Sequence, residues 1–248
     1  MRKILIVGAG KSSPYLIKYL LDKSQDEELL IHITDLDINH LKKYKKFENC
    51  SVSPINILSE KEREKFISES DLVISMLPAR FHIILAKTCL KLKRNLLTAS
   101  YVSEEMKALS HEIKNSELLF LNEMGLDPGI DHMSAKKIID ELVANGAKII
   151  SFKSYTGGLI SPESDNNKWN YKFTWNPRNV VLAGQGMPAK YIENNKYKYI
   201  PYNRLFKNTE KIKIKKYGQF EVYPNRDSLK YREIYSLNNI KTMIRGTI

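Results

Sequence analysis

Long hydrophobic runs and paired cysteines are both scarce in this sequence of 248 residues. No stretch approaches the roughly 18 consecutive apolar residues that a membrane span needs, so we expect no membrane partner. Cys50 and Cys89 are the only cysteines, and neither they nor the five scattered histidines show the spacing of a metal site. The sequence therefore predicts a protein without a metal, from a reducing compartment such as the cytoplasm.

Acidic residues are also in short supply, since 28 Asp and Glu face 40 Lys and Arg, a formal net charge of +12. Much of the excess lies after Lys190, in alternations such as Tyr197–Tyr199 and Lys211–Lys216. Interleaved aromatic and basic residues occur in nucleic-acid-binding proteins. Here the period of two favours strands with one lysine-covered face, so we expect no nucleic acid. A basic surface favours acidic small molecules.

The chain opens on a strand, a glycine-rich turn and a helix. Lys3–Val7 predict a short strand buried on both faces, and a helix is predicted over about 13–21. This order is typical of a dinucleotide-binding βαβ unit, in which Gly8 permits the turn and Gly10 lets the backbone approach a pyrophosphate. Ser13 stands in place of the third glycine, so the loop serines would cap the helix or donate to phosphate. The predicted cofactor loop contains Gly8, Gly10, Lys11, Ser12 and Ser13.

A second predicted strand, Leu29–Thr34, ends in Asp35, 25 residues after Gly10. This is close to the offset of about 20 residues expected for an acid that binds the adenosine ribose. Such an aspartate accepts hydrogen bonds from both ribose hydroxyls and repels a 2′-phosphate. The predicted cofactor is NAD or NADP, with NAD favoured by Asp35. A solvated strand end is the alternative for this residue.

Strands and helices continue to alternate up to about residue 121. We predict strands near 52–57, 71–76, 95–98 and 118–121, and helices over 38–47, 59–68, 81–92 and 103–114. Ser59 and Glu62 form a capping box. This pattern predicts an α/β fold with a doubly wound, Rossmann-type parallel sheet. Ligands bind at the carboxyl ends of the strands in such a sheet. The further predicted cofactor contacts at these ends are Ile55, Asn56, Leu77, Ala99, Ser100, Leu126, Asp127 and Pro128.

The pattern changes after a predicted helix over 131–145, which Gly146 ends. A strand over 149–155 follows, then a long polar loop and short aromatic strands. We predict a dinucleotide-binding domain over 1–126 and a second α+β domain, with a mostly antiparallel sheet, over 127–248. The aromatic strands near 191–202 and 220–223 favour self-association of this second domain into a homodimer.

Several stretches resemble the saccharopine dehydrogenase (L-glutamate-forming) family, also called saccharopine reductase. They span the whole chain in the family's order: Thr98–Tyr101, Asn122–His132, Tyr155–Leu159, Tyr171–Trp175 with Arg178, Tyr223–Asp227 and Ile244–Thr247. The resemblance implies a nicotinamide-dependent oxidoreductase of lysine metabolism acting on a small amino-acid substrate. Saccharopine would be oxidised to an imine, which is hydrolysed to L-glutamate and 2-aminoadipate 6-semialdehyde, and the reverse direction is reductive.

The sequence departs from the family's pattern in three places. Thr156 stands where the family commonly has Cys, so any role of that thiol is absent. NADP-using relatives often carry Arg after the second strand, where this chain has Asp35. Family members also continue well beyond the position of Ile248, so we expect a C-terminal truncation and an incomplete second domain.

Saccharopine carries three carboxylates and two amines, so its site needs cationic forks and acceptors for ammonium groups. Arg226 lies in a Pro-Asn-Arg-Asp turn and offers a planar bidentate fork, which the resemblance places on the substrate. An ion pair with Asp227 or another acid is the alternative. Thr247 is similar to family positions that touch substrate, and Arg245 fits a structural ion pair equally well.

The predicted catalytic residues are Asp127 and Tyr101. Asp127 precedes a proline, and its carboxylate would hold the substrate ammonium or relay a proton; a turn-forming Asp is the alternative. Ser100 and Tyr101 resemble residues between cofactor and substrate, although Tyr101 would also fit as a core aromatic. Asp131 is predicted to cap its helix, and His132 to be a packed residue at the helix start.

Two other functions stay open at this point. One is a related amine-forming reductase, similar to carboxynorspermidine dehydrogenase, although the Tyr223–Asp227 and Arg245–Thr247 stretches favour saccharopine. The other is a nucleotide-binding module without turnover.

Overall fold

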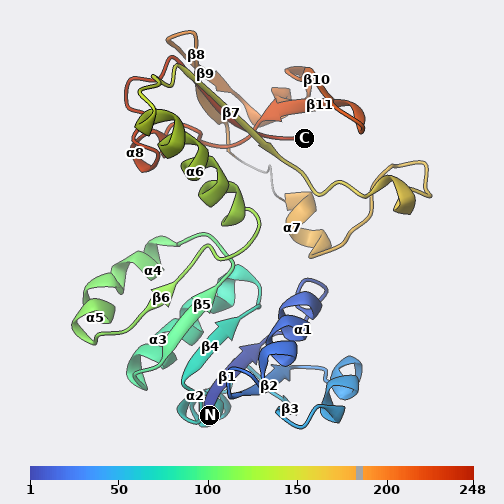
Figure 1. Cartoon of the computed structure of the whole chain (residues 1–248), viewed down its shortest axis with the longest axis vertical. Coiled ribbons are helices and arrows are strands. Elements are labelled where there is room, and N and C mark those ends of the chain that lie inside the picture. Colours follow the sequence, from blue (N-terminus) through green and yellow to red (C-terminus); the bar gives the residue numbers. More distant parts are fainter. Residues whose placement is uncertain (183–186) are drawn as a thin grey trace. The chain divides into compact units, whose positions relative to one another are not determined.

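The computed structural model describes residues 1–182 and 187–248 (Figure 1). Contacts between Cα atoms divide the chain into two compact units, Met1–Ile130 and Asp131–Ile248. The boundary predicted from the sequence lies between 126 and 127. We describe each unit by itself.

The first unit, coloured blue to green in Figure 1, alternates strands and helices along its length. Its elements are β1 (Arg2–Val7), α1 (Pro14–Lys23), β2 (Leu29–Asp35), η1 (Asn39–Lys46), β3 (Cys50–Pro54), α2 (Glu60–Ser68), β4 (Leu72–Ser75), η2 (Ala79–Phe81), α3 (His82–Lys91), β5 (Asn95–Thr98), α4 (Glu104–Ala108), α5 (Ser110–Asn115) and β6 (Phe120–Leu121). All strand pairs are parallel, in the order β3-β2-β1-β4-β5-β6. This is the Rossmann order, which confirms the predicted doubly wound sheet.

The central strand β1 is covered on both faces, as its apolar residues predict. Ile4 and Ile6 pack with Ile17 and Leu21 of α1, whereas Leu5 and Val7 belong to a second cluster. That cluster contains Phe66 and Ile67 of α2 and Leu85, Ala86 and Cys89 of α3. The order reverses beside β1, so the carboxyl ends of β1 and β4 form the crevice where such sheets bind ligands.

Three elements of this unit differ from the sequence prediction. The helix predicted over 38–47 is the 3₁₀ helix η1, and β3 ends at Pro54 rather than near 57. The helix predicted over 103–114 breaks at Leu109, whose backbone N–H bonds to Met106 O. Ser59 accepts from Glu62 N, which confirms that half of the predicted capping box, whereas the Glu62 side chain accepts from Asn56 N. Ser103 caps α4 in the same way by accepting from Met106 N.

The second unit is an α+β domain. Its elements are α6 (Ile130–Ala144), β7 (Ser151–Thr156), η3 (Pro162–Ser164), α7 (Pro177–Leu182), β8 (Ala189–Glu193), β9 (Lys196–Ile200), η4 (Tyr202–Lys207), β10 (Glu210–Ile214), β11 (Gly218–Pro224), α8 (Tyr231–Ile234) and β12 (Thr242–Thr247). The strand order is β10-β11-β12-β8-β9, with antiparallel pairs. β7 adds a parallel pair to β12. The predicted, mostly antiparallel sheet is therefore confirmed.

The lysine alternations are strands, but only one has the expected lysine-covered face. In β10, Lys211 and Lys213 are exposed while Ile212 and Ile214 are half-buried. In the edge strand β9 both tyrosines and both lysines are exposed, so neither face of its first four residues is buried. Among the described residues, no helix is long and apolar enough to cross a bilayer.

Candidate active site

Gly8 directly follows β1, at a point where the chain passes close to the residues after β4. Its φ of +92° lies in the region that favours glycine, and an added Cβ would lie 3.0 Å from Met76 C and from Leu77 Cδ2. Leu77, a predicted cofactor contact, thus packs directly beside the glycine. A glycine is required here by both backbone conformation and space.

Gly10 is different, because an added Cβ would meet no atom within 4 Å. No neighbour within 1–182 or 187–248 requires a glycine at this exposed position, so the space beside it is available to a ligand that approaches the backbone. Ser13 N and Ser13 Oγ both donate to Gly10 O, at 3.1 and 2.8 Å. The prediction that Ser13 caps the helix through its side chain is therefore wrong, since its hydroxyl fixes the loop instead. Lys11 and Ser12 are exposed in this loop.

Asp35 fastens the glycine loop to the end of β2. Its Oδ2 accepts from Ala9 N at 2.6 Å, and its Oδ1 accepts from Leu36 N at 2.7 Å. Each carboxylate oxygen thus accepts one backbone hydrogen bond. Each oxygen keeps a second lone pair, so this geometry neither requires nor excludes the ribose contact on which the preference for NAD rested.

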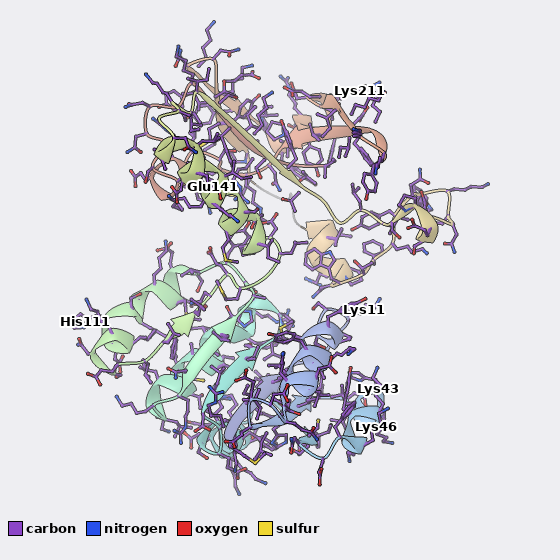
Figure 2. All side chains as sticks on the ribbon, in the orientation of Figure 1. Lys11, Lys43, Lys46, His111, Glu141 and Lys211 are labelled. Carbon is purple, nitrogen blue, oxygen red and sulfur yellow. The ribbon has the colours of Figure 1, made fainter. Side chains whose placement is uncertain are left out.

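A basic pocket of about 280 Å³ lies beside the loop. It is lined by Ala9, Gly10, Lys11, Ser13, Pro14, Ile17, His40, Leu41, Lys43 and Tyr44. His40 Nε2 lies 2.9 Å from Ala9 O, and a carbonyl only accepts, so Nε2 carries a proton. Lys11 and Lys43 come from the loop and from η1 (Figure 2). The pocket can therefore hold an anionic group.

The remaining predicted cofactor residues differ in exposure. Ile55 is buried in the core cluster of Leu5 and Val7, and its N–H donates to Asp35 O. Asn56 uses its side chain to accept from Leu58 N, and its backbone N–H donates to Glu62. Leu126 is 65% exposed, whereas Pro128 is buried. Their contact with a cofactor stays a prediction.

The loops after β5 and β6 are joined by a ladder of hydrogen bonds. Met124 N donates to Thr98 O at 3.0 Å, and Glu123 N donates to Ser100 O at 3.1 Å. Gly129 closes the second loop, because an added Cβ would lie 2.1 Å from Gly125 O. The ladder brings Tyr101 and Asp127 together, and Tyr101 OH donates to Asp127 Oδ1 at 2.6 Å. Both side chains are exposed at the carboxyl edge of the sheet.

His82 is a residue that the sequence analysis missed. It begins α3, is 5% exposed, and lies within 2.8 Å of both the Ser75 and the Ser100 hydroxyls. Desolvation by burial lowers the pKa of His82 to about 4, so the ring is neutral near pH 7. Its position after the strand-ending Leu77-Pro78 was the signal available in the sequence.

In the second unit, Arg226 occupies a turn that is held from both sides. Lys190 N donates to Arg226 O at 2.7 Å, and Asn225 N donates to Arg245 O at 2.9 Å. The φ of Arg226 is +49°, an uncommon conformation for a residue with a Cβ. Its side chain is exposed, and Asn225 Nδ2 donates to Thr247 Oγ1 at 3.1 Å. The turn therefore places Thr247 near the backbone that carries Arg226.

Asp131 lies in the first turn of α6 rather than at its cap, which corrects the predicted role. Its Oδ2 pairs with Arg245 at 2.7 Å, so Arg245 forms the structural ion pair considered above. His132 Nδ1 lies 2.6 Å from Tyr235 OH and its ring stacks on Tyr231. It is a packed residue at the helix start, as predicted.

Comparison with known proteins covers both units. Residues 4–121 match a family model described as the saccharopine dehydrogenase NADP binding domain, and residues 125–248 match the saccharopine dehydrogenase C-terminal domain. The alpha-aminoadipic semialdehyde synthase of Arabidopsis thaliana is 36% identical over 267 residues, covering 99% of this chain. The saccharopine dehydrogenase [NADP(+), L-glutamate-forming] of Saccharomyces cerevisiae is 31% identical over the whole chain.

The solved apo structure of saccharopine dehydrogenase (L-Glu forming) from Saccharomyces cerevisiae has a TM-score of 0.89 and covers 100% of this chain at 31% identity. This chain spans 25% of the Arabidopsis relative and 54% of the yeast relative. It covers 55% of the chain in the solved structure.

Proposed function

Because this chain belongs to the saccharopine dehydrogenase family, we propose that it carries the catalytic core of an oxidoreductase of lysine metabolism. The reaction interconverts saccharopine and water with L-glutamate and 2-aminoadipate 6-semialdehyde, with a nicotinamide dinucleotide as the redox partner. The observation that carries the proposal is the Tyr101–Asp127 pair, which lies on the same sheet edge as the glycine loop.

The site residues have separate tasks in this proposal. A bound nicotinamide supplies the hydride acceptor for the carbon next to the secondary amine. Asp127 holds the substrate's ammonium and takes up or returns the proton on the reacting nitrogen, while Tyr101 keeps that carboxylate in place. Arg226 and Thr247 bind substrate carboxylate groups. Position and electrostatics, rather than a protein nucleophile, are what the chain supplies.

The test is a turnover assay that follows the absorbance of reduced nicotinamide with saccharopine as substrate. Formation of glutamate and the semialdehyde in equal amounts supports the proposal. Turnover of a carboxynorspermidine-type substrate, but not of saccharopine, would select the related amine-forming reductase. Dinucleotide binding without any turnover would select a binding module.

For the cofactor we propose NADP(H). Three observations support it: the matched domain is described as NADP binding, fungal relatives are named for NADP(+), and the pocket beside the loop is basic. Lys11 and Lys43 would receive the 2′-phosphate, and the open space beside Gly10 would receive the pyrophosphate.

Lys43→Ala is therefore expected to raise the dissociation constant of NADPH about three- to tenfold, the loss of one partly exposed charged contact. The dissociation constant of NADH should not change, because NADH lacks the 2′-phosphate. Lys46→Ala is the matched control, since Lys46 lies on the same helix over the Phe47 ring (Figure 2). Fluorescence titration measures the dissociation constants of both cofactors for the parent and the two variants. Equal losses for both cofactors, or a parent that prefers NADH, would contradict this assignment.

The proposal also covers the oligomeric state of the protein. We propose a homodimer formed through the second unit, because Tyr197, Tyr199 and Phe206 expose 55–65% of their surfaces on or after the edge strand β9. Light scattering at micromolar concentration should give twice the monomer mass, and Tyr199→Lys should shift the mass towards monomer. A parent that is monomeric would contradict it.

The proposed location is the cytoplasm, although the rodent and bovine relatives are named as mitochondrial.

A further inference from the structure

A buried chain of three side chains joins the interior of the sheet to the candidate site. Ser75 ends β4 and is fully buried, His82 begins α3 at 5% exposure, and Ser100 follows β5. Ser75 Oγ lies 2.8 Å from His82 Nδ1, and His82 Nε2 lies 2.8 Å from Ser100 Oγ. Of the three, Ser100 alone has appreciable exposure.

The imidazole of His82 is neutral, so it has one N–H donor and one acceptor nitrogen. Burial, which lowers the pKa of His82, disfavours the charged ring, and so does the positive end of the α3 dipole. Each ring nitrogen faces one serine hydroxyl, which leaves two arrangements of protons along the chain. They differ in which serine donates to the ring.

The burial of Ser75 decides between the two arrangements. Among the described residues, the hydrogen-bond partner of the Ser75 hydroxyl is His82 Nδ1. A proton on Nδ1 would leave the hydroxyl hydrogen of a fully buried serine without an acceptor, which proteins avoid. Ser75 therefore donates to Nδ1, and the proton of His82 lies on Nε2 and is donated to Ser100 Oγ. The hydroxyl proton of Ser100 is then left to point away from the ring.

We propose that His82 is a positioning residue that, as the Nε2–H tautomer, holds Ser100 as a hydrogen-bond donor to a carboxylate of the substrate. This rests on the proposed function, since the substrate is the tricarboxylate saccharopine. A carboxylate only accepts hydrogen bonds, and it accepts them more strongly than a neutral oxygen does because they are charge-assisted. The opposite tautomer would draw the Ser100 proton inward and turn its oxygen towards that carboxylate.

The tautomer can be measured without any substrate or turnover. In protein labelled with ¹⁵N-histidine, the His82 ring should show an unprotonated Nδ1 and a protonated Nε2 at pH 7. His82→Gln assigns the resonances by removing them, and Ser75→Ala should weaken the preference for this tautomer. A proton on Nδ1 would overturn the proposal. An inactive parent would overturn the proposed function, yet this measurement would still decide the role of His82.

Kinetics tests the ligand that Ser100 binds. His82→Asn keeps an amide near the Nδ1 position and removes the group that reaches Ser100, and Ser100→Ala removes the hydroxyl itself. Each should raise the KM for saccharopine about tenfold, with kcat within about threefold. The dissociation constant of NADPH should be unchanged in His82→Asn, which keeps Ser100 itself. The double variant should be no worse than either single variant, because both break one interaction. His82→Gln, whose amide reaches the Nε2 position, should restore part of the loss.

His111→Gln is the matched control, since His111 is exposed on α5 and should leave every constant unchanged (Figure 2). Multiplying losses in the double variant would show that His82 acts apart from Ser100 and would overturn the proposal. A raised dissociation constant for NADPH with an unchanged KM for saccharopine would mean that Ser100 donates to the cofactor, and would also overturn the proposal.

Discussion

Replacing Asp127 with asparagine is expected to lower kcat for saccharopine by about 10²- to 10⁴-fold, the usual contribution of a positioned acid–base group. The amide oxygen still accepts the hydrogen bond that Tyr101 donates at 2.6 Å, so the loop geometry should survive. The negative charge and the proton-accepting oxygen are lost. NADPH binding should change little, since asparagine keeps an oxygen and the same shape for the predicted contact of this residue with the cofactor.

Tyr101→Phe separates the two members of the pair. It removes the hydroxyl that holds the Asp127 carboxylate but keeps the carboxylate itself, so the expected loss is about tenfold, near the worth of one hydrogen bond to a charged group. Both variants are compared in the turnover assay, with thermal unfolding as the check on folding. If Asp127→Asn keeps activity within threefold of the parent, Asp127 does not relay the proton and is a turn-forming residue.

The first unit could be predicted closely because its signals are local. A short apolar run such as Ile4–Val7, followed at once by a glycine turn, favours a strand covered on both faces, and such a strand is present. The rule that ligands bind at the carboxyl ends of parallel strands then gathers loops distant in sequence. Tyr101 and Asp127, 26 residues apart, meet for this reason.

What could not be predicted depends on pairing between distant side chains. Asp131 stands where a helix cap is expected, yet the ion pair with Arg245, 114 residues later, takes its carboxylate. Asp35 ends its strand at the expected offset, but its carboxylate also accepts a hydrogen bond from Ala9 N in the glycine loop, which the offset does not indicate. His82 has no local motif, because its role arises from two serines at the ends of neighbouring strands. No pattern of spacing in a single sequence reports such contacts.

Arg226→Lys is expected to raise the KM for saccharopine between about tenfold and a hundredfold. A guanidinium binds a carboxylate through two parallel charge-assisted bonds, each worth about 1.5–3 kcal/mol, and lysine loses the fork while keeping the charge. Since 1.4 kcal/mol is about a factor of ten, the loss of one bond gives this range. NADPH binding should not change, because its predicted contacts lie in the other unit.

The turn that holds Arg226 makes lysine the right replacement. Lysine carries the same Cβ, so the cost of the φ of +49° is the same in parent and variant. The backbone bonds to Lys190 and Arg245 involve no side-chain atom of Arg226 and should persist. Unfolding temperature should therefore be unchanged, and Arg204→Lys, at an exposed arginine of η4, controls for the substitution itself. A variant with unchanged KM would make Arg226 structural. A variant that loses stability and cofactor together would place it in the scaffold of the second unit, and the substrate's carboxylate would need another partner.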